Sequence, residues 1–368
     1  MNTMRAARLH AVGQPMSLDE VERPIATGSD VVVRVKACGM VPNLANVLAN
    51  WETWYPQMPL PPRPAIHGLD PSGIVHQVGP QVVSIKPGDR VYVNPGRFCG
   101  ACHHCSSGKP QACEYWTLGG YFGYNPKSME MFDRYPYGGF GEYMLAPQAQ
   151  IVKIPEKMSF VEGSRMGYLG TSYAALKKCG PLMGKTLIIN GATGTLGLGA
   201  VLFALSMGVA RIYAVARGEK LLERLKAIAS DRIVTFSNAN GSSGAFVREQ
   251  TNGTGADLML DTLGAKAPLE SMLDAMRGVK RGGRIVNIGG TSGELPVDVK
   301  WWMDEQMELI GSVWFTAAEG MEIAAMVEAG IIDLSVMSPM VWPIEKINEA
   351  ISGVGKDEGG FTYYAVEL

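Results

Sequence analysis

The sequence has no apolar run long enough to span a membrane, and its first residues, MNTMRAARLHAVGQPMSLDE, carry charges where a signal peptide would need an apolar stretch. An excess of charge of one sign is also lacking, because 33 lysines and arginines offset 35 aspartates and glutamates. Nucleic-acid and membrane-surface sites need concentrated lysine and arginine, which this chain spreads thinly. We therefore expect a cytoplasmic protein with no nucleic-acid partner and no membrane partner.

Cysteine is scarce outside one short stretch, FCGACHHCSSGKPQAC, which begins at Phe98 and holds four of the six cysteines. Such clustering suits a thiolate metal site in a reducing compartment better than a disulfide framework. Four thiolates close a tetrahedral zinc site and leave no position for water or substrate, so the site is structural.

A redox-active cysteine cluster is the alternative, but it would more often show an isolated C-x-x-C pair beside a βαβ unit. His103 and His104 could replace a ligand, although a full set of cysteines makes this unnecessary. The other two cysteines, Cys38 and Cys179, are expected to be buried thiols. The predicted ligands of one structural Zn2+ are Cys99, Cys102, Cys105 and Cys113.

The chain changes character near residue 155, which predicts two domains within its 368 residues. Before that point, Pro- and Gly-rich turns separate short β-branched runs such as DVVVRVKAC and GIVHQVG, a pattern typical of an antiparallel β domain. After it, strand-like runs alternate with helical ones, from TLIIN to ELIGSVWF, and this alternation predicts a parallel, doubly wound sheet. After about Phe315 a helix and a last strand, TYYAVEL, could return to the first domain.

A cofactor motif lies in the second part, at TLIINGATGTLGLG. The strand ends at Asn190 and a helix follows, so glycines at the turn let the backbone approach a pyrophosphate while the helix N-terminus favours its charge. A tight turn with glycines for packing is the alternative, but the βαβ context favours a dinucleotide. The predicted contacts are Gly191, Gly194, Thr195, Leu196 and Gly197.

The end of the next strand lacks the acidic residue that would bond the ribose hydroxyls of NAD. The segment YAVARGEK offers Ala216 and then Arg217, whose guanidinium can bind a 2'-phosphate bidentately, with Lys220 as a second cation within reach. The sequence therefore favours NADP(H) over NAD(H). The alternative is that both cations are solvated loop charges.

The order of VVVRVKACG, GLDPSGIVHQVG, KPGDRV, the cysteine run, GGFGEYML, GATGTLG and GGRIVNIGG resembles the medium-chain dehydrogenase/reductase superfamily, which includes zinc alcohol dehydrogenases and quinone oxidoreductases. The resemblance covers nearly the whole chain and implies an α/β protein. It implies a GroES-like catalytic domain at residues 1–168 with a structural zinc lobe at 98–114. A Rossmann domain at 169–313 and a segment at 314–368 that completes the first domain would follow. A homodimer or homotetramer is also implied.

The ligands of the family's catalytic zinc are missing from this sequence. The three ligand positions match Val41, Leu69 and Gly167. None of these residues binds a metal, and a catalytic zinc needs three convergent ligands plus an open position. Asp70 stands where the family has a glutamate, and His67 is two residues out of register. Two scattered donors do not make such a site, so we expect no catalytic zinc and expect His67 to be a loop or core histidine.

Losing that zinc changes which reactions are expected, because zinc holds the alkoxide that develops when alcohols and carbonyls interconvert. Reduction of an activated C=C bond needs weaker electrophilic stabilisation, since hydrogen-bond donors can stabilise the enolate that forms. The resemblance to zinc-free reductases therefore favours NADPH-dependent reduction of an enone, enal or quinone-like substrate. A zinc-independent alcohol or aldehyde dehydrogenase is the second hypothesis. The third is a non-catalytic NADPH-binding protein with a structural or sensor role.

Candidate pocket residues follow from the same resemblance. Asn43 and Asn46 stand where alcohol dehydrogenases keep a proton relay, and an amide can donate a hydrogen bond but cannot exchange protons near neutral pH. Each candidate has a structural alternative; Asp70, for example, could accept bonds from neighbouring backbone amides. The predicted catalytic residues are Asn43, Asp70, Tyr92 and Tyr168.

Two aromatic stretches, WETWYPQMP and YFGYNPKSMEMFDRYPYGGF, favour a large apolar or aromatic substrate, since the family places the loop before its GHE motif at the substrate pocket. Anchoring of loops on a β domain, or a subunit interface, explains them nearly as well. The resemblance places further cofactor contacts at strand ends that face the cleft. These residues are Thr171, Thr262, Leu263, Ile288, Gly289, Gly290, Val313 and Trp314.

Overall fold

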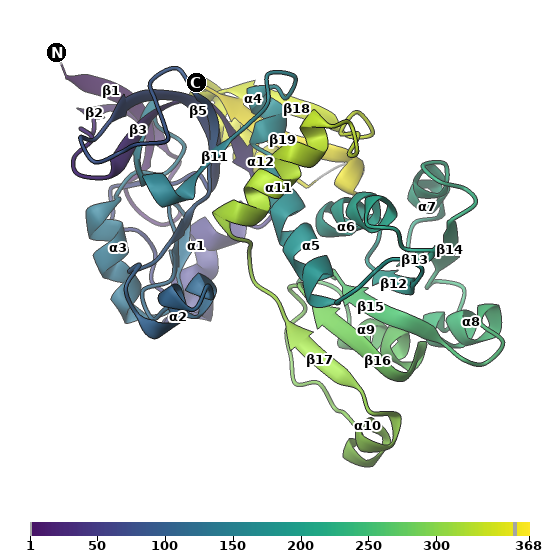
Figure 1. Ribbon diagram of the computed structural model, residues 1–368. Helices are drawn as coiled ribbons and strands as arrows, with labels where there is room; N and C mark the ends of the chain where they lie inside the picture. Colours follow the sequence, from purple (N-terminus) through teal and green to yellow (C-terminus); the bar gives the residue numbers. More distant parts are fainter. Residues whose placement is uncertain (1, 356–358) are drawn as a thin grey trace.

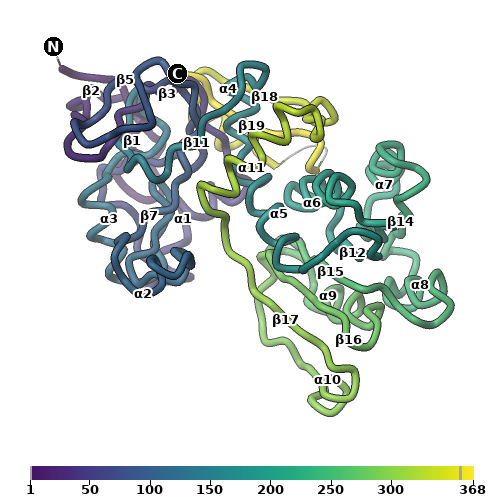
Figure 2. The backbone as a smooth tube through the Cα atoms, in the orientation of Figure 1, coloured from purple at the N-terminus to yellow at the C-terminus, as the bar shows by residue number. Residues whose placement is uncertain are grey.

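The chain leaves one lobe, builds a second and returns to the first, so both termini lie in the same lobe (Figure 1). The structure is a computed structural model that describes residues 2–355 and 359–368. The last strand, β19 (Thr362–Glu367), pairs antiparallel with β3 (Asp30–Met40). In Figure 2 the yellow C-terminal segment accordingly lies beside the purple and blue start of the chain. The end of the chain thus rejoins the first lobe through this pairing.

The first lobe is built on a 7-stranded sheet with the order β11-β6-β5-β3-β19-β18, in which β10 also pairs with β3. Alternate residues of β3, among them Val31, Val33 and Val35, are at most 1% exposed and pack on β5, β6 and β10. β-branched side chains suit this pleated, two-sided burial. The elements that precede the second lobe are β1 (Thr3–Leu9), β2 (Ser17–Glu22), β3, α1 (Leu44–Trp54), β4 (Ala65–Ile66), β5 (Asp70–Val78), β6 (Arg90–Val93), β7 (Gly96–Arg97), α2 (His103–Ser106), β8 (Thr117–Leu118), β9 (Phe122–Gly123), α3 (Met129–Arg134), β10 (Tyr143–Pro147), β11 (Ile151–Lys153) and α4 (Phe160–Gly163).

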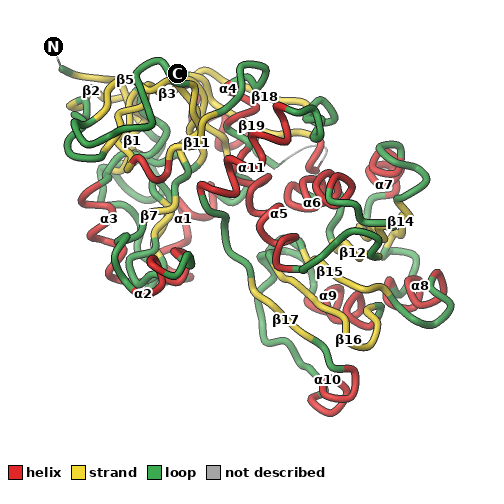
Figure 3. The backbone as a smooth tube through the Cα atoms, viewed as in Figure 1, coloured by secondary structure: helices red, strands yellow, loops and turns green. Residues whose placement is uncertain are grey.

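The second lobe is a 6-stranded parallel sheet with the order β14-β13-β12-β15-β16-β17 and helices between the strands (Figure 3). The strand order reverses between β12 and β15, and ligands bind at the carboxyl ends of strands at such a point. Together the two lobes confirm the predicted fold class, a GroES-like β domain plus a Rossmann-type domain. The elements of this part are α5 (Met166–Lys178), β12 (Thr186–Asn190), α6 (Thr195–Ser206), β13 (Arg211–Ala216), α7 (Glu219–Lys226), β14 (Ile233–Ser237), α8 (Ser243–Gln250), β15 (Ala256–Asp261), α9 (Leu269–Arg277), β16 (Val279–Asn287), α10 (Val299–Glu305) and β17 (Glu308–Gly311).

The return segment begins where the sequence suggested a longer strand. Of the run ELIGSVWF, only β17 pairs with the sheet, and Ser312 to Phe315 form a loop that leads into the next helix. Trp314 in this loop has a left-handed backbone with φ of 61°, which a strand does not allow. The remaining elements are α11 (Ala317–Glu328), β18 (Ser338–Pro343), α12 (Ile347–Gly353) and β19.

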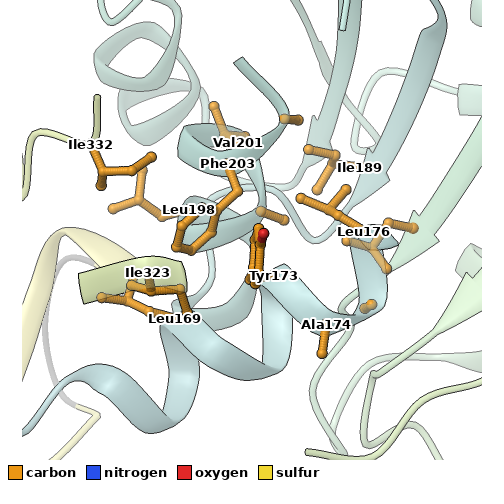
Figure 4. Close-up of a cluster of buried hydrophobic side chains, with 14 of the residues drawn as sticks. Leu169, Tyr173, Ala174, Leu176, Ile189, Leu198, Val201, Phe203, Ile323 and Ile332 are labelled. Carbon is orange, nitrogen blue, oxygen red and sulfur yellow. The ribbon is translucent and has the colours of Figure 1, made fainter. Parts of the chain in front are cut away.

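The helix α5 joins the lobes and carries much of the shared core (Figure 4). Its residues Leu169, Tyr173 and Leu176 pack against Leu198 and Phe203 of α6, and all five are at most 5% exposed. Each such side chain contributes about 1.5–3 kcal/mol by leaving water. This packing fixes the start of α5 beside the start of α6, where the candidate site lies.

Among the residues described, no helix combines the length and apolar character that a membrane span requires.

Candidate active site

The four predicted zinc ligands converge in the lobe that carries α2. Their Sγ atoms all lie within 4.8 Å of one another, with Cys102 to Cys105 at 3.5 Å and Cys113 to Cys99 at 3.6 Å. Tetrahedral zinc with Zn–S bonds of about 2.3 Å separates its sulfurs by about 3.8 Å, so the cluster fits the ion. His103 and His104 are exposed and lie outside this group. Within the described residues, no other group of three or more Cys, His, Asp or Glu side chains could hold a metal ion.

The glycine-rich turn after β12 fits a dinucleotide. Gly191 has a left-handed φ of 84°, and a Cβ there would lie 2.9 Å from Thr262 Oγ1. A Cβ at Gly197 would lie 2.2 Å from Gly191 O, so this glycine is needed for the close packing of turn and helix. Gly194 precedes α6 without a side-chain cap, which leaves the first N–H groups, those of Thr195 and Leu196 included, free of a capping side chain. Phosphate is the usual ligand of such a helix start.

The predicted selectivity residues lie at the end of β13, the strand next to β12. Ala216 is its last residue and is 6% exposed, whereas the side chains of Arg217 and Lys220 are exposed. Ser237 Oγ donates a hydrogen bond of 2.9 Å to Arg217 O, which fixes the backbone there. The loop therefore presents two cations at the edge where the adenosine half of a dinucleotide would lie.

The other predicted cofactor contacts follow the carboxyl ends of β15, β16 and β17. Thr262 Oγ1 donates to Asn190 O at 2.8 Å, and Gly290 N donates to Leu263 O at 2.7 Å. Ile288 N donates to Asp261 O at 3.0 Å, which holds Ile288 and Gly289 beside the same strand end. Thr171 was predicted at a strand end, but it lies in the helix α5, where its Oγ1 donates to Gly167 O at 2.8 Å. These contacts bring the ends of β15 and β16 and the glycine-rich turn after β12 together at one edge of the sheet.

The loop that carries Val313 and Trp314 is fastened to the first lobe by Asn94, which sequence reasoning missed. Asn94 is fully buried, its Oδ1 accepts from Trp314 Nε1 at 3.0 Å, and its Nδ2 donates to Phe315 O at 3.2 Å. A non-glycine residue with positive φ costs free energy unless its surroundings hold it. The amide therefore stabilises the left-handed backbone of Trp314. The one signal in the sequence is a polar residue at the end of the apolar run VYVN.

The three residues that the resemblance matches to the family's catalytic zinc ligands offer no metal-binding side chain, and their surroundings are closed. Val41 and Leu69 are at most 4% exposed and belong to the core of the first lobe. A Cβ at Gly167 would lie 2.0 Å from Asp70 Oδ1. The Asp70 carboxyl thus occupies the space that a side chain at position 167 would need.

Asp70 and Tyr92, two predicted catalytic residues, are in direct contact. Tyr92 Oη donates a hydrogen bond of 2.7 Å to Asp70 Oδ1, and the two side chains are at most 1% exposed. Burial raises the pKa of Asp70 to about 7, against smaller lowering effects of Tyr92 and Arg165. The Asp70 carboxyl can therefore carry or release a proton near neutral pH.

The other two predicted residues lie beside this pair. Asn46 Nδ2 donates to Asn43 Oδ1 at 3.0 Å, and the Asn43 amide in turn contacts the buried hydroxyl of Tyr121. Burial raises the pKa values of Tyr121 and Tyr168, and both tyrosines are close enough to Asp70 to be affected by its charge. The structure thus brings the predicted residues together in one polar cluster, in which Asp70 and Tyr92 are buried and Asn43 and Tyr168 are partly exposed. It adds Tyr121, which is buried.

Two further buried groups complete the surroundings. His67 is 1% exposed, and burial lowers its pKa to about 4, so it is a neutral core histidine as expected. Arg165 was missed, although it is the one charged residue in the run GSRMGYLGTSY. It is 6% exposed, and its guanidinium lies over the ring of Tyr168 at 5.1 Å.

The aromatic stretches serve the core more than an open pocket. Trp51 stacks on Phe122 with ring centroids 4.3 Å apart, and Tyr121, Tyr135 and other rings of the second stretch are buried. Trp54, at 52% exposed, is the main exception among the tryptophans and tyrosines of the first stretch. Loop anchoring therefore accounts for most of these rings.

Comparison with known proteins agrees with this geometry. Residues 27–156 match the alcohol dehydrogenase GroES-like domain, and residues 195–329 match the zinc-binding dehydrogenase family. An alcohol dehydrogenase of Geobacillus stearothermophilus is 31% identical over 96% of this chain and 97% of its own length. The chain belongs to the medium-chain dehydrogenase/reductase superfamily. The resemblance inferred from the motifs is thereby confirmed.

Other members of the superfamily extend the comparison. An NAD-dependent alcohol dehydrogenase of Sulfurisphaera tokodaii is 27% identical, with 95% of this chain and 96% of that protein covered. The solved structure of a thermostable alcohol dehydrogenase from Pyrobaculum aerophilum is 26% identical and superimposes with a TM-score of 0.79 over the full length of both chains. As a medium-chain dehydrogenase/reductase, the protein is an oxidoreductase that acts on small molecules with a nicotinamide cofactor.

Proposed function

We propose that this medium-chain dehydrogenase/reductase reduces the activated C=C bond of an α,β-unsaturated carbonyl compound with NADPH and without a catalytic zinc. The observation that carries the proposal is the replacement of the metal site. Val41, Leu69 and Gly167 offer no ligand, and the Asp70 carboxyl fills the space beside Gly167. A titratable acid therefore stands where the superfamily's zinc enzymes hold a Lewis acid.

The chemistry of an enone suits such a site. Reduced nicotinamide, when bound at the carboxyl edge of the parallel sheet, supplies a hydride to the β-carbon of the substrate. The C=C electron pair then moves toward the carbonyl oxygen, and the enolate so formed takes a proton at its α-carbon. Hydrogen-bond donors stabilise an enolate well, whereas the alkoxide of an alcohol dehydrogenase needs a stronger electrophile.

The polar cluster around Asp70 supplies these donors in the proposal. The hydroxyls of Tyr168 and Tyr121 and the Asn43 amide are the candidates for a hydrogen bond to the enolate oxygen. Asp70, with a pKa of about 7, is the candidate for the acid that gives up the proton. Tyr92 is a positioning residue, because its hydroxyl holds one Asp70 oxygen at 2.7 Å.

NADPH is the proposed cofactor because of the end of β13. Exposed Arg217 and Lys220 follow Ala216, so two cations stand where an NAD-binding protein would place a carboxylate. A guanidinium can bind the 2'-phosphate bidentately. The lobe with Cys99, Cys102, Cys105 and Cys113 is proposed to hold one structural zinc.

A second copy of the chain is the proposed macromolecular partner. Among the strands of the described residues, β17 pairs only with β16 and so forms one edge of the parallel sheet. Apolar side chains are exposed on and near this edge, among them Val299, Met303 and Leu309, which is 43% exposed. An unpaired strand edge with apolar neighbours favours pairing with another chain. Sedimentation of the wild type and of Leu309→Lys tests this proposal. We expect the wild type to be a dimer or tetramer and Leu309→Lys to be a smaller species. A monomeric wild type would contradict the proposal.

The reaction is tested with paired substrates, each an enone or enal beside its saturated ketone or aldehyde. NADPH oxidation is followed, and products are identified by mass spectrometry and NMR. Turnover of the unsaturated members alone, with saturated carbonyl products, is the expected result. Alcohols formed from both members would contradict it.

The second candidate is a zinc-independent alcohol or aldehyde dehydrogenase. It is favoured by the relatives, since the Geobacillus stearothermophilus protein of 31% identity is an alcohol dehydrogenase. The same paired assay distinguishes the two, because this activity yields alcohols. Saturable binding of NADPH without turnover of any substrate would instead support the non-catalytic hypothesis.

A further inference from the structure

Arg165 is a buried cation that forms no salt bridge within the part of the chain that the structure describes. It precedes α5 and is 6% exposed, and its Nε has no hydrogen-bond partner among the described residues. Burial lowers its pKa to about 10, so the guanidinium stays charged at neutral pH. Asp70 acts on it only through its charge, without a hydrogen bond between the two. A buried charge with unused donors is costly, which points to a missing partner.

The side chain points at the start of α6. Arg165 Nη2 approaches Thr195 O at 3.4 Å, and Thr195 is the first residue of the helix. No side chain caps this helix, so its first N–H groups and the macrodipole already form a positive site. Placing an arginine beside a helix N-terminus adds repulsion unless an anion lies between them.

The opposite side of the turn is already covered. Gly360 N donates to Thr193 O at 2.8 Å, and a Cβ at Gly360 would lie 2.4 Å from Gly194 O. The carbonyl oxygens of the turn thus face the C-terminal segment. The N–H groups at the start of α6 are left for a ligand.

Two aromatic rings hold the guanidinium in place. Its Cζ lies 5.1 Å from the ring centroid of Tyr168 in α5 and 5.9 Å from that of Tyr363 in β19. Such cation–π contacts fix the orientation of the fork while leaving its N–H groups available. A guanidinium held this way loses little freedom on binding a phosphate bidentately.

We propose that Arg165 binds the diphosphate of the nicotinamide dinucleotide, together with the N–H groups at the start of α6. The site then consists of one anion-binding helix start in the second lobe and one cation that precedes the helix joining the lobes. The inference rests on the proposed function only in requiring a dinucleotide cofactor. It is independent of the choice between NAD and NADP, because both carry the diphosphate.

The experiment compares Arg165→Gln and Arg165→Lys with the wild type by calorimetric titration of ADP-ribose, NADH and NADPH. Loss of charge-assisted hydrogen bonds predicts affinities for all three that are weaker by roughly 10–100-fold in Arg165→Gln. Arg165→Lys keeps the charge but not the fork, so a smaller loss is expected. The ligand-free melting temperature of Arg165→Gln should be equal or higher, because an unpaired buried charge is removed.

Two controls keep the test independent of the reaction and of the cofactor preference. Arg211→Gln changes an exposed arginine at the opposite end of β13 and should leave all three affinities unchanged. Arg217→Ala should weaken NADPH alone, so a failure there would count against NADPH and not against Arg165. An unchanged affinity for ADP-ribose in folded Arg165→Gln would overturn the proposal. If that variant does not fold, an unchanged affinity in Arg165→Lys would overturn it equally.

Discussion

Tyr92 Oη lies 2.7 Å from Asp70 Oδ1, and this contact joins two strands inside the first lobe. β5 and β6 are antiparallel neighbours in which Ser72 stands opposite Tyr92, so Asp70 is two residues from the paired position. A long side chain reaches such a diagonal neighbour. The hydrogen bond is therefore built into the sheet, and the acid it holds can differ in proton affinity from an exposed aspartate.

This burial predicts a pH-dependent stability that Asp70→Asn removes. Because the folded pKa of Asp70 is raised from 3.8 to about 7, the folded state binds this proton more tightly than the unfolded state. Its contribution to stability is then full below about pH 4 and is lost as the pH rises toward 7. Between pH 5 and pH 8 the wild type should lose on the order of 2 kcal/mol more than Asp70→Asn.

Urea denaturation of both proteins at pH 5, 6, 7 and 8 measures this difference. Tyr92→Phe, which keeps the ring and removes the hydroxyl, serves as a second comparison and should raise the Asp70 pKa further. Stability profiles that run parallel for wild type and Asp70→Asn would show that Asp70 is ionised throughout the range.

Gly167 should be intolerant of any side chain as long as Asp70 is present. Alanine in place of a helical glycine normally stabilises by about 1 kcal/mol. Here the Cβ would lie 2.0 Å from a buried carboxylate oxygen that Tyr92 also holds, so we expect Gly167→Ala to destabilise by about 2 kcal/mol. Chemical denaturation of Gly167→Ala, Asp70→Ala and the double variant forms a cycle in which the double variant loses less than the sum. Additive losses would mean that the two positions do not compete for space.

Much of the fold was predictable from local patterns, because strands and helices of the second lobe repeat with clear periods. TLIIN is β12 as predicted, and the glycine-rich turn follows it at Gly191. The run ELIGSVWF was read as one strand, but β17 ends at Gly311 because the loop beyond it is tied to the first lobe through Asn94. Such a contact joins residues 221 apart in sequence and leaves no local pattern.

The candidate site was predictable as a set of positions but not as a set of contacts. Asp70 and Tyr92 were predicted as separate candidates from the resemblance, whereas their hydrogen bond depends on the register of β5 with β6. The contact of Asn43 with Tyr121 depends on packing between separate elements in the same way. Arg165 escaped notice because charged residues are normally exposed, and no sequence pattern indicates that an arginine will be buried.

The cysteine lobe should contain one zinc per chain and have no part in hydride transfer. Elemental analysis of the purified protein is expected to give one equivalent, and Cys102→Ser is expected to give none together with a lower melting temperature, because the lobe loses its central bonds. Mild chelation that leaves the metal in place should also leave turnover unchanged. A second equivalent of zinc that departs together with activity would overturn the assignment of the ligands.

Cofactor preference should depend on Arg217 more than on any other exposed cation of the second lobe. Its guanidinium follows the last residue of β13, where the 2'-phosphate of NADPH would lie and where the strand ends in Ala216 rather than in a carboxylate. Removing one charge-assisted, bidentate contact predicts a loss of roughly 10–100-fold in NADPH affinity for Arg217→Ala. NADH, which has no 2'-phosphate, should bind Arg217→Ala and wild type alike. Arg217→Glu should prefer NADH, because the new carboxylate repels phosphate and can accept hydrogen bonds from the ribose hydroxyls.

Fluorescence titration with both cofactors measures the ratio of the NADPH and NADH affinities, with Arg211→Ala at the other end of the strand as the matched control. Equal losses for NADH and NADPH would place Arg217 near the part that the two cofactors share, and the preference for NADPH would then have to be abandoned.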